Sequence, residues 1–109
     1  GRMRQVLFNL LVNALRYTPA GGEIIVRTRR EGTKTVIEVQ DNGPGMEENI
    51  RRRVFEPFFT TKEVGVGTGL GLSVSYFIIT KQHKGTLTVE STPGKGARFI
   101  IRLPLAQEG

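Results

Sequence analysis

The sequence predicts an α+β fold, a two-layer α/β sandwich in which helices cover one face of a largely antiparallel sheet. Two long segments repeat apolar residues every three or four positions, which is typical of amphipathic helices. Four short segments are β-prone and are joined in pairs by turn residues, which predicts two hairpins. The chain has 109 residues, enough for one modest domain.

The first helix is expected to end near residues 17–18. Its apolar positions form one stripe, made of Met3, Val6, Leu7, Leu10, Leu11, Ala14 and Leu15. Pro19 stops it, because a proline disfavours helical geometry in the residue before it. A short helix is predicted over residues 47–55, then an irregular stretch over 56–68. A second long helix is predicted over 70–83, with Gly85 as its C-terminal cap.

The two hairpins are predicted from strands at residues 23–30 and 34–41, and at residues 86–91 and 97–103. Alternate residues of a strand share one face of the sheet. Asp41 therefore stands at the end of the second strand, where the backbone is about to turn.

Composition and charge exclude several classes of protein. There is no cysteine, which excludes disulfide scaffolds and cysteine-ligated zinc. No apolar run is long enough to cross a bilayer, so we expect no direct membrane insertion. The net charge is +6, but the basic residues are scattered. Their densest run, residues 51–53, is interpreted as a solvated helix face, and we expect no nucleic-acid binding.

The run that follows Asp41 combines a carboxylate with two glycines, Gly43 and Gly45. A carboxylate accepts hydrogen bonds and so complements the exocyclic amine of adenine, which donates them. Glycines let the backbone approach a flat ring closely. The alternative is an ordinary turn, because Asn-Gly and Pro-Gly are common turn pairs. So much turn sequence directly after a strand favours a nucleotide pocket.

A second glycine run, residues 65–71, has glycine at every second position. Glycines expose backbone amides, and the helix predicted from residue 70 offers its positive end to phosphate. A P-loop is excluded because Gly71 is followed by leucine and serine, not by lysine and a hydroxyl residue. The dinucleotide fingerprint and the signatures of eukaryotic protein kinases are also absent.

Asn9 and Asn13 lie four residues apart and project from one face of the first helix. An amide oxygen is a hard, neutral ligand suited to Mg²⁺ that carries substrate phosphates. Arg16 lies on roughly the same side and can meet phosphate oxygens. Tyr17 can stack on a base or close the core. Taken alone, the two asparagines read more simply as a polar helix face.

Four segments together resemble the motifs of bacterial sensor histidine kinases, in the order that family has them. Residues 7–17 (LFNLLVNALRY) resemble the asparagine box, and residues 41–45 (DNGPG) resemble the first glycine box. Residues 55–62 (FEPFFTTK) resemble the phenylalanine box, which separates histidine kinases from the gyrase and MutL ATPases of the same superfamily. Residues 67–72 (GTGLGL) resemble the second glycine box.

The resemblance implies a Bergerat-type fold with a mixed, mostly antiparallel sheet that binds ATP and Mg²⁺. Asn13 would coordinate Mg²⁺, supported by Asn9, and Asp41 would bond the adenine amine. The other residues assigned to the nucleotide by matching position are Arg16 and Lys62 at the phosphates, Tyr17 against the nucleotide, Gly43, Gly45 and Met46 at the base, and Gly67, Thr68, Gly69, Leu70 and Gly71 at the hinge of a lid over ATP.

The resemblance also implies partners. Such a domain donates the γ-phosphoryl group of ATP to a histidine on a separate helical dimerisation domain, and a response regulator acts downstream. The acceptor histidine and its base are not in this sequence. We expect His83 to cap a helix or face solvent, so the chain alone should not autophosphorylate. The expected location is the cytoplasm, with a parent protein that can be anchored in the inner membrane.

Three departures from the family pattern stand out. A strand usually precedes the asparagine box, so we expect residues 1–109 to form one N-terminally truncated catalytic domain without that edge strand. Ala97 stands where threonine or serine is frequent. Lys84 replaces a frequent glycine, with no expected effect. The alternatives are a nucleotide-binding interaction module without transfer activity, or a serine kinase of the anti-sigma-factor type with the same fold.

Overall fold

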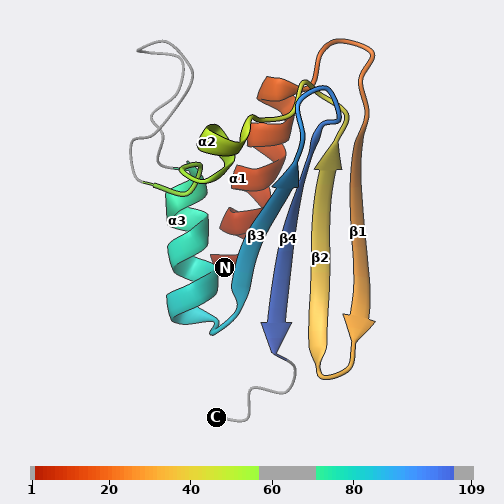
Figure 1. Ribbon diagram of the computed structural model, residues 1–109. Helices are drawn as coiled ribbons and strands as arrows, with labels where there is room; N and C mark the ends of the chain where they lie inside the picture. The colour runs from red at the N-terminus through yellow and green to blue at the C-terminus, as the bar shows by residue number, and fades with distance from the viewer. Residues whose placement is uncertain (1, 57–70, 105–109) are drawn as a thin grey trace.

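The computed structural model describes residues 2–56 and 71–104 and has the predicted layers. Its elements are α1 (Arg2–Tyr17), β1 (Ile24–Glu31), β2 (Lys34–Asp41), α2 (Glu48–Arg51), α3 (Gly71–Phe77), the π-helical segment η1 (Ile78–Gln82), β3 (Thr86–Ser91) and β4 (Ala97–Pro104). The described strands form one sheet in the order β1-β2-β4-β3, with each neighbouring pair antiparallel. The helices lie on one face of this sheet (Figure 1).

The core lies between this sheet face and part of the predicted apolar stripe of α1, because Leu11 and Leu15 of that stripe are exposed. Val6 and Leu10 of α1 are fully buried, and Ala14 nearly so. Burial alternates along β3, whereas the central strands β2 and β4 also bury residues of the other face, namely Val36, Glu38 and Ile100. The buried residues on the helix-covered face form the core. They pack with α1 and η1 in one cluster that includes Val39, Ile78, Ile79, Leu87, Val89, Ala97, Phe99 and Ile101.

The two hairpins meet where β2 pairs with β4. Asp41 at the end of β2 is opposite Ala97 at the start of β4, and Ala97 is opposite Ser91 at the end of β3. These residues lie in one row across the sheet, on the face that carries the core. The end of β2 is thereby set beside the turn that joins β3 to β4.

The predicted helix over residues 47–55 is wrong in its length, because α2 covers only Glu48–Arg51. Beyond it the backbone bonds span three residues, from Arg53 N–H to the Ile50 carbonyl and from Glu56 N–H to the Arg53 carbonyl. Such bonds form turns that are tighter than an α-helix. The side chains of residues 51–53 form ion pairs with Glu48 and Glu56, as expected of a solvated charged face.

Gly85 takes part in the helix cap through its N–H, which bonds the Ile79 carbonyl at 2.8 Å, but it is not the left-handed residue that the prediction made it. The second long helix ends in a π-helical turn, with the His83 N–H bonded to the Ile78 carbonyl, and the left-handed residue that follows is Lys84 (φ 59°). Gly85 has a different reason to be glycine, since a Cβ there would lie 2.3 Å from the carbonyl oxygen of Arg102 in β4. Lys84 therefore carries a conformational cost that a glycine at this position would avoid.

We predict that Lys84→Gly stabilises the chain. A left-handed conformation costs a non-glycine residue about 1–2 kcal/mol, part of which is offset by the larger unfolded-state entropy of glycine. A net gain of about 1 kcal/mol should raise the Tm by about 4–8 °C in a thermal unfolding experiment. The matched control is Lys81→Gly inside η1, which should lower the Tm because glycine is unfavourable in a helix. An unchanged or lower Tm for Lys84→Gly would contradict this account.

Candidate functional site

Asp41 is a buried carboxylate held by backbone alone. Its side chain is 5% exposed, and Oδ1 accepts a hydrogen bond of 2.8 Å from the Gly43 N–H. Within residues 2–56 and 71–104, no basic side chain forms an ion pair with Asp41, and Oδ2 accepts no hydrogen bond. Among the described residues only Oδ1 has a hydrogen-bond donor, so Oδ2 is the acceptor that remains for a bound donor.

The segment from Asp41 to Met46 lies directly against the β3–β4 turn. Gly45 has a φ of +75°, and a Cβ on it would lie 2.2 Å from the Thr92 carbonyl oxygen. Gly96 has a φ of +76°, and its Cβ would lie 2.1 Å from the carbonyl oxygen of Asp41. At Gly45 the close neighbour is therefore the protein's own turn, whereas the sequence prediction concerned a flat ring.

Hydrogen bonds join the same two segments. The Gly94 N–H donates to the Pro44 carbonyl at 2.6 Å, and the Met46 N–H donates to Ser91 Oγ at 2.8 Å. Ser91 Oγ in turn donates to the Gly96 carbonyl at 2.7 Å. The sequence reasoning missed Ser91 and this turn, because their role depends on a contact between segments 45 residues apart.

The two asparagines of α1 have different surroundings. Asn9 Nδ2 lies 3.3 Å from both the Gly71 carbonyl and Ser75 Oγ, so its amide donates to the first turn of α3. Asn13 is partly exposed and makes no hydrogen bond to any residue that the structure describes. Arg16 is exposed near the end of α1. The predicted pair therefore divides into one asparagine that joins two helices and one that stays open to a ligand.

The described site residues gather at one end of the molecule. The C-terminal end of α1 and the end of β2 lie at this end, and α3 begins beside α1 and next to α2 (Figure 1). Gly71 is the first residue of α3, and a Cβ there would be 4.0 Å from Asn9 Cγ. Lys62, Gly67, Thr68, Gly69 and Leu70 lie outside the described residues, and so does the side chain of Tyr17.

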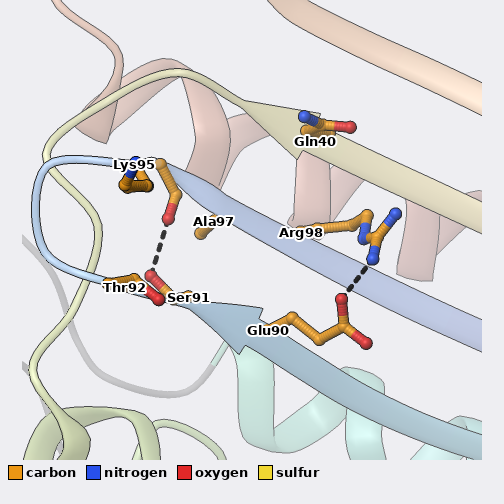
Figure 2. Close-up of a pocket in the computed structure, with 8 residues that line it drawn as sticks. Gln40, Glu90, Ser91, Thr92, Lys95, Ala97 and Arg98 are labelled. Carbon is orange, nitrogen blue, oxygen red and sulfur yellow. Dashed lines mark hydrogen bonds and ion pairs between the residues drawn. The ribbon is translucent and has the colours of Figure 1, made fainter.

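A shallow hollow of about 190 Å³ lies on the helix-free face, behind the β3–β4 turn. It is lined by Gln40, Glu90, Arg98 and the turn residues, and Figure 2 shows the side chains of Glu90 and Arg98 paired across it. None of the residues assigned to the nucleotide lines this hollow. The side chain of Asp41 projects from the opposite face of the sheet to those of Gln40 and Arg98.

The helix-free face carries an ion-pair network centred on Glu38. Its carboxylate is 5% exposed, pairs with Arg29, and lies 3.6 Å from Arg98 Nη1. The hydrogen bond from Arg29 holds the pKa of the Glu38 carboxyl below its ordinary value, although burial opposes this shift. The sheet thus holds two buried acids that differ in whether a basic side chain pairs with them. Glu38 is neutralised by arginines, whereas Asp41 on the other face is not.

Comparison with known proteins assigns the chain to a family. Residues 1–107 match the family model described as "Histidine kinase-, DNA gyrase B-, and HSP90-like ATPase". The chain belongs to this family. Sporulation kinase E of Bacillus subtilis is 46% identical over 107 residues, covering 97% of the chain and 14% of that protein. Sensor kinase CckA of Brucella abortus is 45% identical over 119 residues, covering 95% of the chain and 12% of that protein.

Solved structures agree with the assignment. The catalytic domain of histidine kinase ThkA superposes with a TM-score of 0.83 at 39% identity, covering 94% of this chain and 66% of that one. Full-length ShkA in complex with AMPPNP gives a TM-score of 0.84 at 32% identity, covering 96% of this chain and 22% of that one. The predicted resemblance to the catalytic domain of sensor histidine kinases and the predicted Bergerat-type fold are confirmed.

The chain spans about an eighth of the length of the two sensor kinases it matches. None of its described helices has the length and apolar character needed to cross a membrane.

We predict that Glu38 contributes stability that depends on pH. Its pKa is lowered in the folded chain, so the contribution is fully present above the ordinary value of 4.5 and is lost progressively as the pH falls from there through the lowered pKa of the folded chain. Glu38→Gln should cost about 1 kcal/mol near neutral pH and progressively less as the pH falls below 4.5, measured by urea unfolding. Glu90→Gln, at an exposed carboxylate paired with Arg98, is the control and should cost less at neutral pH.

Proposed function

We propose that this chain binds Mg·ATP and is the catalytic domain from which a sensor histidine kinase transfers the γ-phosphoryl group. The observation that supports this most directly is Asp41, a buried carboxylate with Oδ1 occupied by the Gly43 N–H. The fold and family of the chain support it as well. The AMPPNP complex of ShkA belongs to a protein of the same fold, which agrees with a nucleotide site.

In this proposal Asp41 selects the base. Its Oδ2 accepts a hydrogen bond from the exocyclic amine of adenine, while Gly43, Gly45 and Met46 line the pocket. Guanine carries an oxygen at the matching position and would place one acceptor against another. A single carboxylate held by the backbone can therefore favour ATP over GTP.

Mg²⁺ would be held by Asn13 together with phosphate oxygens and water. The chemistry of Asn13 fits, because its amide is partly exposed, hydrogen-bonds to none of the described residues and offers a hard neutral oxygen. Within residues 2–56 and 71–104, no three His, Cys, Asp or Glu side chains converge on a metal position. Bound Mg²⁺ supplies charge neutralisation at the phosphates.

The phosphates would lie between the end of α1 and the start of α3. We assign Arg16 and Lys62 to the phosphate oxygens, Tyr17 to the nucleotide, and Gly67, Thr68, Gly69, Leu70 and Gly71 to the hinge of a lid. Asn9 holds α1 to α3 through Gly71 and Ser75, and so supports Asn13 from one turn away. In this arrangement the protein mainly positions the nucleotide and neutralises charge.

The phosphoryl acceptor is proposed to be a histidine on a separate helical dimerisation domain. Its imidazole nitrogen forms the new bond to the γ-phosphorus as the bond to ADP breaks. His83, the C-terminal cap of η1, is assigned no such role. A complex of ThkA with the response regulator protein TrrA, in which ThkA is 34% identical to this chain with a TM-score of 0.80, supports a response regulator as the downstream partner. We place the domain in the cytoplasm, where ATP is available.

We predict that Asp41→Asn weakens Mg·ATP binding about tenfold or more, since a hydrogen bond to a charged group is worth about 1.5–3 kcal/mol. The Gly43 N–H would keep the amide oxygen of the new side chain, so its NH₂ group would face the donor amine of adenine. Isothermal titration calorimetry measures the Kd. The control is Glu47→Gln, the same change at an exposed acid, and an unchanged Kd in Asp41→Asn would refute the assignment.

Asn13→Ala should lower the affinity for Mg·ATP by a similar factor of about ten and leave the weaker binding of ATP in EDTA unchanged. The reason is that the lost amide oxygen serves the metal. Gln5→Ala, an exposed amide on the same helix, is the control. Equal losses with and without Mg²⁺ would contradict the role given to Asn13.

Phosphoryl transfer is tested by adding a helical domain with a phosphoacceptor histidine, taken from a similar sensor kinase, in trans with γ-labelled ATP. Label is expected on the added histidine and not on the chain alone. A chain that binds Mg·ATP and labels no such domain would support the alternative of a nucleotide-binding module. Label on His83 would overturn the proposal that the acceptor histidine belongs to a separate domain.

A further inference from the structure

The Ser91 hydroxyl is the centre of a small clasp between the two segments that meet beneath the base site. It accepts from the Met46 N–H at 2.8 Å and donates to the Gly96 carbonyl at 2.7 Å (Figure 2 shows the second bond). A hydroxyl has one hydrogen to donate. The clasp uses that donor, so Ser91 has none left to offer a ligand, and its contribution must be positional.

The clasp lies at a close backbone contact between the segment that carries Gly45 and Met46 and the β3–β4 turn. Gly45 and Gly96 each face a backbone carbonyl so closely that a Cβ would lie within 2.2 Å of it. The Gly94 N–H adds a second bond across the contact, to the Pro44 carbonyl. A shift of the segment that carries Gly45 and Met46 is therefore limited on one side by this packing, and on the other by the two bonds.

The clasp also lies in the same row of the sheet as the proposed base acceptor. Asp41, Ala97 and Ser91 are opposite one another on β2, β4 and β3. Ala97 contributes only a methyl group, so the hydroxyl of this row comes from Ser91. The position of Met46 relative to Asp41 is thus set through β3 and the turn.

We propose that Ser91 is a positioning residue for adenine selectivity. Its hydroxyl keeps the backbone of Gly45 and Met46 at the distance from Asp41 that an adenine ring requires. This role rests on the proposed function of the site. Without the hydroxyl the segment moves away from the turn, and the base loses its fit while the fold remains.

The test compares Kd values of Mg·ATP and Mg·GTP by calorimetry for the 109-residue chain and its variants. Ser91→Ala is expected to raise the Kd for ATP about tenfold, and the Kd for GTP about threefold at most, because the lost hydrogen bonds serve the adenine fit. Ser91→Thr keeps the hydroxyl and should restore both Kd values to within about twofold. Thr88→Ala, an exposed hydroxyl on the same strand, is the matched control and should change neither.

Melting temperatures without nucleotide accompany each Kd. Ser91→Cys, which keeps the side-chain size and weakens both bonds, is measured as a second variant in case Ser91→Ala does not fold, and should also raise the Kd for ATP more than that for GTP. Equal loss of ATP and GTP binding, an unchanged Kd, or no rescue by Ser91→Thr would overturn the role of Ser91. A wild-type chain that binds neither nucleotide would instead overturn the proposed function and this role with it.

Discussion

The antiparallel pairing of β2 with β4 is the constraint on which the rest of the structure depends. It joins two hairpins that are far apart in the chain and sets Asp41 opposite Ala97. From that register follow the burial of Asp41, the contact of Gly96 with the Asp41 carbonyl, and the contact of Gly45 with Thr92. A slip of one residue would turn Asp41 to the helix-free face and separate it from α1.

Each face of the sheet carries a buried carboxylate, and the two carboxylates have different hydrogen-bonding and charged partners. Glu38 is surrounded by Arg29 and Arg98, so its charge is neutralised within the protein. Asp41 receives only a backbone N–H from Gly43. A buried charge without a cation is costly unless it is hydrogen-bonded, and sites that bind ligands are where such costs are commonly found. This contrast separates the structural acid from the candidate ligand-binding acid, although both belong to the same strand, β2.

The order of the elements was predictable because each depends on a local pattern. The stripe from Met3 to Leu15 and the alternation in the strands give the observed helix and hairpins to within one or two residues. The short α2, the left-handed Lys84 and the Ser91 clasp were not predictable, because tertiary contacts decide them. Gly85 shows the difference well. It looks like a helix cap in sequence, yet it is glycine because β4 passes close to it.

The candidate site was predictable only in part for the same reason. The spacing of Asn9 and Asn13 correctly puts both on one helix face, but spacing alone cannot show that α3 occupies one of them. Once Asn9 donates to Gly71 and Ser75, its amide is committed to holding α1 beside α3. Asn13 lies one turn nearer the end of β2 and keeps its amide open among the described residues. Two chemically identical side chains on one helix thus have different roles. Asn9 supports the helix packing and Asn13 is a candidate ligand for the metal, because the described part of α3 accepts hydrogen bonds only from the first of them.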